Sequence, residues 1–269
     1  MAGASSTGAV SMSAEPSTVP RVRVLGCPAD AVDMDGAVRW LLDLVDAGRA
    51  GTRRPGLVVT LNPEMVMRAR RDAAFREHLD GAGLLVPDGI GIVRALRRRG
   101  HAEAQRVGGA DLLLEYLPHA VRMEHRVALV GAAPGVAEQA ARRLGERFPG
   151  LHVVAADGGP PDAATATRVS AARPEIVLAA YGAGLQEAFL VRYLDAVGAF
   201  GGIGVGGSLD YFSGRIRRAP RLVQRAGLEW AWRLAREPWR ARRQLVLPRY
   251  WLLERLEAAA RSRRPSPRP

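Results

Sequence analysis

One carboxylate stands where it could act as a catalytic base. Asp88 lies in the segment V-P-D-G-I-G, directly after an apolar run and directly before a helical pattern. A carboxylate at such a place can accept a proton from a substrate hydroxyl group. It can equally cap the helix that follows by accepting hydrogen bonds from free backbone amides. The position of Asp88 alone favours neither role.

Three further polar residues could contact a substrate. Thr60 and Asn62 stand at the end of an apolar run in T-L-N-P-E, where their side chains could bind a sugar. Asn62 directly precedes Pro63, so taken alone it is more typical of a helix cap. Arg106, in Q-R-V-G-G-A-D, could pair with a diphosphate, or it could be an ordinary surface residue among 39 arginines.

Glycine turns suggest a place where the backbone approaches a phosphate. Residues 202–207 match G-x-G-x-x-G by letters, but no strand-turn-helix unit of the required length follows. We therefore expect Gly204, Gly206 and Gly207 to approach a nucleotide phosphate rather than to form a dinucleotide fingerprint. Gly131 begins a similar turn.

The sequence offers weak support for a metal site. Asp33-Met-Asp35 spells the D-x-D of some metal-dependent sugar transferases, but it opens a helical pattern far from the other polar residues. Helix capping is the favoured interpretation, and we expect no metal ligands. The single cysteine, Cys27, excludes a disulfide framework.

The elements that must position these residues alternate between strand and helix. Short apolar runs predict strands at 22–25, 57–61, 84–86, 126–130, 151–155, 176–180 and 203–205. Helices are predicted at 33–47, from 63, at 90–99, at 112–121 with Asp111 as the cap, at 136–148, 165–172 and 186–197. This order predicts an α/β fold, a Rossmann-like parallel sheet with helices on both faces. Ligands bind at the carboxyl ends of such strands, where the polar and glycine residues gather, so an enzyme is favoured over a binding-only fold.

The excess positive charge lies in the last fifth of the chain. The net charge of +12 equals that of residues 215–269, where 16 arginines face four acidic residues. Four of the five tryptophans also lie there, and leucine and tryptophan recur at helical spacing beside arginines. An apolar stripe beside a basic stripe is typical of a helix at an anionic interface. Residues 1–20 lack the basic and apolar blocks of a secretory signal and are expected to be a disordered leader.

Seven stretches, in order, resemble the WecG/TagA/CpsF glycosyltransferases (glycosyltransferase family 26) over about residues 22–255. They are T-L-N-P-E-M-V (60–66), V-P-D-G-I-G (86–91), R-V-G-G-A-D-L-L (106–113), P-G-V-A-E (134–138), Q-E (186–187), G-V-G-G-S-L-D (204–210) and R-A-P…G-L-E-W…R-L…E-P (218–238). The resemblance implies an inverting transfer of a sugar from a UDP-sugar to a sugar carried on polyprenyl diphosphate, without an obligatory metal or other cofactor. It implies N-acetylmannosamine, its uronic acid or glucose as the donor sugar.

The resemblance also implies roles for individual residues. Asp88 would be the general base, Thr60 and Asn62 would line its pocket, and Arg106 and Gln186 would contact the diphosphate or the transferred sugar. The glycines Gly131, Gly204, Gly206 and Gly207 would frame the UDP site. The arginines Arg218, Arg225 and Arg233, from a C-terminal appendage that docks on the membrane, would help to close the site.

The implied organisation has four parts. A core at 21–214 would comprise an acceptor-binding and catalytic half (21–120) and a nucleotide-sugar half (121–214). A membrane-associating appendage (215–257) and a disordered tail (258–269) would follow. The protein would lie in the cytoplasm on the inner face of the plasma membrane, with a tendency to form homo-oligomers.

Two loops depart from the family pattern, and two other functions compete. A-G-L-Q-E (183–187) lacks the usual proline and basic residue, and D-G-G (157–159) stands where the family has H-G-Y, so the donor sugar is left open. In R-V-G-G the family's threonine is replaced by Gly108.

The alternative from another functional class is a nucleic-acid-binding protein that uses the basic tail, because aromatic residues among arginines can bind single strands. The third candidate function is a dinucleotide-dependent oxidoreductase, for which the sequence lacks a complete dinucleotide-binding fingerprint.

Overall fold

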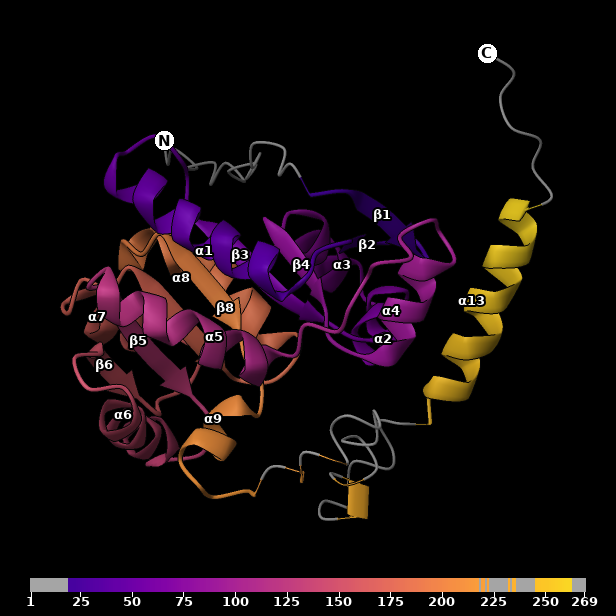
Figure 1. Ribbon diagram of the computed structural model, residues 1–269. Helices are drawn as coiled ribbons and strands as arrows, with labels where there is room; N and C mark the ends of the chain where they lie inside the picture. Colours follow the sequence, from indigo (N-terminus) through magenta and orange to yellow (C-terminus); the bar gives the residue numbers. More distant parts are fainter. Residues whose placement is uncertain are drawn as a thin grey trace, which may run out of the picture.

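A six-stranded parallel sheet forms the centre of the protein (Figure 1). The computed structural model describes residues 19–217, 219–220, 222, 232, 234–235 and 245–262. The strand order is β4-β3-β8-β7-β5-β6, and every neighbouring pair is parallel. The strands are β3 (Gly56–Leu61), β4 (Leu84–Pro87), β5 (Arg126–Gly131), β6 (His152–Asp157), β7 (Ile176–Ala180) and β8 (Gly201–Gly204). The predicted parallel α/β fold is confirmed.

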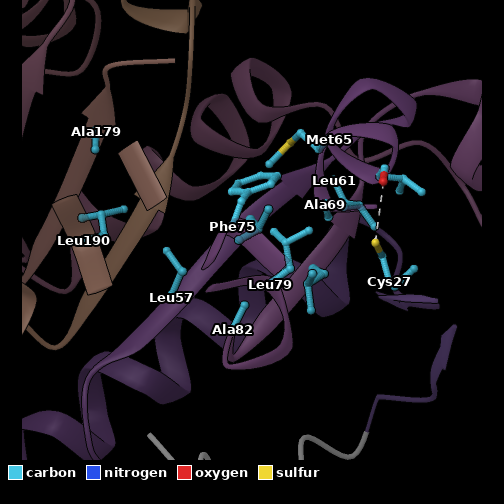
Figure 2. Packing of buried hydrophobic residues seen from close by; sticks show 14 of the residues in the cluster. Cys27, Leu57, Leu61, Met65, Ala69, Phe75, Leu79, Ala82, Ala179 and Leu190 are labelled. Atoms are coloured by element: carbon cyan, nitrogen blue, oxygen red, sulfur yellow. Dashed lines mark hydrogen bonds between the residues drawn. The ribbon is translucent and has the colours of Figure 1, made fainter. Parts of the chain in front are cut away.

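Helices cover both faces of this sheet because its inner strands are apolar on both sides. One face carries α2 (Pro63–Ala69), α3 (Ala73–Asp80), α4 (Ile90–Arg97), α7 (Ala163–Ser170) and α8 (Leu185–Val197). The other carries α1 (Met34–Arg49), α5 (Gly109–Arg122), α6 (Val136–Arg147) and α9 (Ser208–Phe212). Along β3, Leu57 and Leu61 face the first layer and Val58 faces the second, which produces two separate apolar cores. Figure 2 shows Phe75 and Leu79 of α3 packed near Leu57 in the first core.

An antiparallel hairpin lies beside the β4 edge. It consists of β1 (Arg21–Val24) and β2 (Cys27–Asp30), and the sequence analysis predicted only its first strand. The buried Asp30 carboxylate accepts hydrogen bonds from Arg21 Nε at 2.7 Å and from the Leu85 amide at 2.8 Å. This carboxylate ties the hairpin to β4. Cys27 is a buried free thiol, seen in Figure 2 beside the Val66 carbonyl.

The last described element is a long helix, α13 (Leu247–Ser262), which lies beside α2 and α4 (Figure 1). It continues five residues beyond 257, so the expected start of a disordered tail at 258 is wrong. Glu254 and Glu257 attach the helix to the core through ion pairs with Arg98 and Arg99, which directly follow α4. No helix among the described residues is long and apolar enough to cross a bilayer.

The expected division of the core at residue 120 stays a prediction. Strands from both proposed halves join one continuous sheet, in which β8 pairs with β3 on one side and with β7 on the other. The expected cap of α5 was wrong: Gly108 is the N-cap, and Asp111 lies inside the first turn. Asp111 instead lies 3.7 Å from Arg106, measured between Oδ2 and Nη1.

Candidate active site

The carboxyl ends of β3 and β8 are joined by a side-chain hydrogen bond. Thr60 Oγ1 donates to the Gly204 carbonyl at 3.1 Å, and the Thr60 side chain is almost completely buried. A Cβ atom at Gly109, in the first turn of α5, would lie 3.2 Å from Thr60 Cγ2 and 3.7 Å from Ser208 Oγ. Helix α5 therefore begins against the end of β3 and the start of α9. Thr60 has a structural role, because it holds the ends of β3 and β8 together.

Gln186 holds the turn that follows β8. Its side chain is 3% exposed, its Oε1 accepts from the Gly206 amide at 3.0 Å, and its Nε2 donates to Glu187 Oε1 at 2.8 Å. Gly206 has φ +49°. A Cβ at Gly204 would lie 2.5 Å from Gln186 Nε2, so only glycine admits the amide there. Gln186 thus fixes the glycine turn through hydrogen bonds within the protein.

Glu187 holds the Gln186 side chain in place by accepting its amide hydrogen bond. It is fully buried, and its second carboxylate oxygen accepts from the Gly184 amide at the start of α8. Burial raises the pKa of the Glu187 carboxyl above its usual range. The sequence analysis gave this residue no role, although a glutamate three residues after the N-cap glycine is the spacing of a capping box.

Asp88 follows β4 and does not cap the next helix. The N-cap of α4 is Gly89, with φ +135°, and this cap has no side-chain hydrogen bond. The Asp88 amide donates to the Leu61 carbonyl at 2.8 Å, which binds the loop to the end of β3. The Asp88 carboxylate is about a quarter exposed, and Arg106 Nε donates to its Oδ1 at 3.3 Å. The capping alternative for Asp88 is therefore not supported, and the structure brings Asp88 and Arg106 together.

Asn62 does cap a helix, as its sequence position favoured. Its side chain accepts from the Met65 amide at 3.1 Å, and Pro63 occupies the first position of α2. The capping bond fixes the direction of the side-chain amide. A Cβ at Gly89 would lie 3.8 Å from Asn62 Cβ, so Asn62 stands beside the Asp88 loop.

Several helices at this edge of the sheet begin with glycine and have no side-chain cap. Gly89, Gly108, Gly135 and Gly207 are the N-caps of α4, α5, α6 and α9. By contrast, α7 at the outer strand is capped by Asp162. Backbone amides at a helix start can bind phosphate oxygens, and the helix dipole favours negative charge there.

Gly131 stands at the end of β5, beyond β7. Its φ is +84°, and a Cβ there would lie 2.7 Å from the Tyr181 ring, so glycine is required. Gly131 pairs in register with Ala180, which brings its turn next to the loop between β7 and α8. The glycine turns after β5 and β8 thus lie on the same edge of the sheet as Asp88.

The proposed metal motif serves another purpose. Asp33 is the N-cap of α1, and its Oδ1 accepts from the Gly36 amide at 2.8 Å, which confirms the capping interpretation. Over the described parts of the chain, no cluster of three or more acidic, histidine or cysteine side chains could hold a metal ion. Arg218, Arg225 and Arg233 lie outside the described residues.

These groups gather at the carboxyl edge of the parallel sheet, where ligands bind in α/β folds. The partly exposed Asp88 carboxylate pairs with the Arg106 guanidinium, which lies against Gly108 at the open start of α5. The model of the glycosyl transferase WecG/TagA/CpsF family matches residues 22–265. The chain belongs to this glycosyltransferase family.

Two relatives carry the same descriptive name, N-acetylglucosaminyldiphosphoundecaprenol N-acetyl-beta-D-mannosaminyltransferase. The one from Bacillus subtilis (strain 168) is 33% identical over 198 residues, which cover 73% of this chain and 77% of the relative. The one from Bacillus spizizenii (strain W23) is 35% identical over 195 residues, covering 72% and 76%. The resemblance found in the sequence is thereby confirmed.

Proposed function

We propose that this protein transfers N-acetylmannosamine from UDP to N-acetylglucosamine carried on polyprenyl diphosphate. The acceptor hydroxyl attacks the anomeric carbon as the bond from that carbon to the UDP oxygen breaks. The hydroxyl proton passes to the Asp88 carboxylate, and UDP leaves as an anion. The observation that carries the proposal is the Asp88–Arg106 pair beside Gly108 at the start of α5, in a chain whose relatives are named for this sugar and acceptor.

Each group at the edge of the sheet has a part in this reaction. Attack from the face opposite the leaving UDP inverts the anomeric centre and needs a single base, which Asp88 supplies. Arg106 and the amides at the open helix starts stabilise the charge that grows on the departing diphosphate. Asn62 contacts the acceptor sugar. Thr60 and Gln186 position the β8 turn, which carries Gly206 and Gly207 towards the nucleotide.

A donor panel tests the activity. UDP release is measured with UDP-N-acetylmannosamine, its uronic acid and UDP-glucose, each with a polyprenyl-diphosphate-linked N-acetylglucosamine acceptor. We expect release with UDP-N-acetylmannosamine, and Asp88→Asn should lower kcat by about 10²–10⁴-fold, the usual contribution of a general base. Asp195→Asn, at an exposed position near the end of α8, is the matched control. If UDP is released only with another donor, the proposed donor sugar is wrong and that donor takes its place. If no donor releases UDP, the proposal is overturned.

We further propose that the protein binds an anionic membrane surface on the cytoplasmic side, where a lipid-linked acceptor is available. Leu252 and Leu256 are 60% and 58% exposed, one turn apart on α13, with the exposed Arg249 and Arg255 beside them. Exposed apolar side chains among arginines suit an interface with anionic lipid. The basic segment that precedes this helix adds to the attraction.

Vesicle cosedimentation tests the membrane proposal. We expect binding to phosphatidylglycerol vesicles but not to phosphatidylcholine vesicles, and a weaker association after Leu252→Ser combined with Leu256→Ser. Val191→Ser, at an exposed apolar site on α8, is the control. Stronger binding to single-stranded oligonucleotides than to anionic vesicles would support the nucleic-acid alternative instead. Sedimentation of the free protein would show whether it forms a homo-oligomer.

A further inference from the structure

We propose that Tyr250, on the last helix, is a positioning residue for the loop that carries Asp88. Docking of α13 would then set the rate of sugar transfer as well as tie down the end of the chain. The inference rests on the proposed role of Asp88 as the base.

Tyr250 reaches the Asp88 loop directly. It is completely buried, and its hydroxyl donates to the Gly91 carbonyl at 3.1 Å. Gly91 lies three residues after Asp88, in the first turn of α4. A Cβ at Gly91 would lie 3.0 Å from the Tyr250 ring and 2.6 Å from Pro63 Cγ. The Gly91 backbone is therefore held between a proline ring and a tyrosine ring, with no room for a side chain.

The same packing continues to the second substrate-facing loop. Pro63 directly follows Asn62, and its ring also lies close to Gly89, where a Cβ would be 3.3 Å from Pro63 Cδ. The Gly91 backbone thus packs between Pro63 and Tyr250, and this packing supports the two loops that carry Asn62 and Asp88. A shift of Tyr250 would change the position of both loops, and displacements of about 1 Å can cost large factors in rate.

Other contacts attach α13 firmly without Tyr250. The buried Glu254 carboxylate pairs with Arg98 and with Arg99, the latter at 2.9 Å. Glu257 accepts from Arg99 Nη2 at 2.6 Å and from the Leu25 amide at 2.9 Å. These ion pairs lie at the far end of α4 from Asp88. The Tyr250 hydroxyl is therefore not required for attachment, whereas it is the contact that meets the Asp88 end of α4.

Helix α13 also directly follows the basic part of the chain. Residues 213–246 lie in the sequence between α9, which ends at Phe212, and α13, which begins at Leu247. This part of the chain is therefore covalently joined to the start of α13, where Tyr250 lies.

Tyr250→Phe is the test, because it removes the hydroxyl and keeps the buried ring. In the donor assay we expect kcat to fall roughly 10-fold, a KM for the UDP-sugar within about 2-fold of wild type, and a shifted acid limb of the kcat–pH profile. Tyr193→Phe, on a half-buried tyrosine of α8, should change none of these quantities. Glu254→Gln should lower the melting temperature more than Tyr250→Phe does and lower kcat less. The inference would be overturned if Tyr250→Phe and wild type had equal kcat values. It would also be overturned if the decrease in kcat were proportional to the decrease in melting temperature across all variants.

A second measurement does not depend on turnover. The amides of Ile92 and Val93 donate to the Gly89 carbonyl at 3.1 and 3.2 Å, so their hydrogen exchange reports on the loop. Tyr250→Phe should accelerate this exchange at least about 5-fold, and Tyr193→Phe should leave it unchanged. Unchanged exchange in Tyr250→Phe would overturn the inference even if wild-type protein transferred no sugar. Absence of transfer by wild-type protein, with accelerated exchange in the variant, would overturn the proposed activity alone.

Discussion

Replacing Gly204 by alanine tests whether Gln186 organises the site. The new methyl group would lie 2.5 Å from Gln186 Nε2 and 3.0 Å from Glu187 Oε1. Ordinary contact begins near 3.4 Å, so the Gln186 amide has to move by about 1 Å. Gly204 does not have a positive φ, so the substitution introduces a steric conflict and not backbone strain.

The cost follows from the hydrogen bonds that such a movement breaks. Gln186 makes two, to the Gly206 amide and to Glu187, and all three residues are buried or half-buried. Each buried polar group left without a partner costs about 1–3 kcal/mol. We expect the free energy of unfolding to fall by about 2–4 kcal/mol, a large part of the 5–15 kcal/mol typical of a domain. Transfer should fall at least about 10-fold because the β8 turn is released.

Urea unfolding and the donor assay measure these two effects. Gly145→Ala is the matched control, because nothing lies within 4 Å of a Cβ there and the residue is inside α6. Alanine at an open helical site should raise stability by up to about 1 kcal/mol and leave transfer unchanged. If Gly204→Ala unfolds at the wild-type urea concentration and transfers sugar at the wild-type rate, the role assigned to Gln186 is wrong.

Two further predictions concern pH and metal. Burial lowers the pKa of His125, so the folded state takes up a proton there less readily than an unfolded histidine, which titrates near about pH 6.5. The free energy of unfolding should therefore decrease as pH falls through 6.5, by up to about 1.4 kcal/mol per pH unit. In acid titrations followed by circular dichroism, His125→Gln should make the free energy of unfolding depend less on pH. The same substitution at the exposed His152 should leave the pH dependence unchanged. Chelator should leave transfer unchanged because Asp33 already caps α1, and a large loss restored by a divalent cation would contradict this.

The central fold could be predicted because most strands of the parallel sheet have a clear apolar pattern. The runs at 57–61, 127–130 and 176–180 are buried on both faces, as is typical of parallel strands between two helix layers. The antiparallel β2 was missed because C-P-A-D contains a proline and an aspartate, which are rare in strands. Its stability comes from the bonds between Asp30, Arg21 and Leu85, which no local pattern shows.

The site could be predicted in part. Asp88, Thr60 and Gly204 stand at strand ends, and the parallel arrangement alone brings strand ends to one edge of the sheet. The inward direction of Gln186 was not visible in the sequence, because a glutamine at a helix start is usually exposed. The docking of Tyr250 was also missed, since its partner Gly91 is 159 residues away.

The position of β8 has a consequence for how the chain folds during synthesis. β3 and β7 form no direct pair, and their shared neighbour β8 is the last strand of the sheet to be made. Until residues 201–204 leave the ribosome, two partly formed sheets each present an unpaired apolar edge, which is a template for aggregation. The contacts that join them are far apart in sequence and therefore slow to form. A nascent chain stalled before β8 would depend on chaperones, and the few glycine-rich residues of β8 would complete both halves at once.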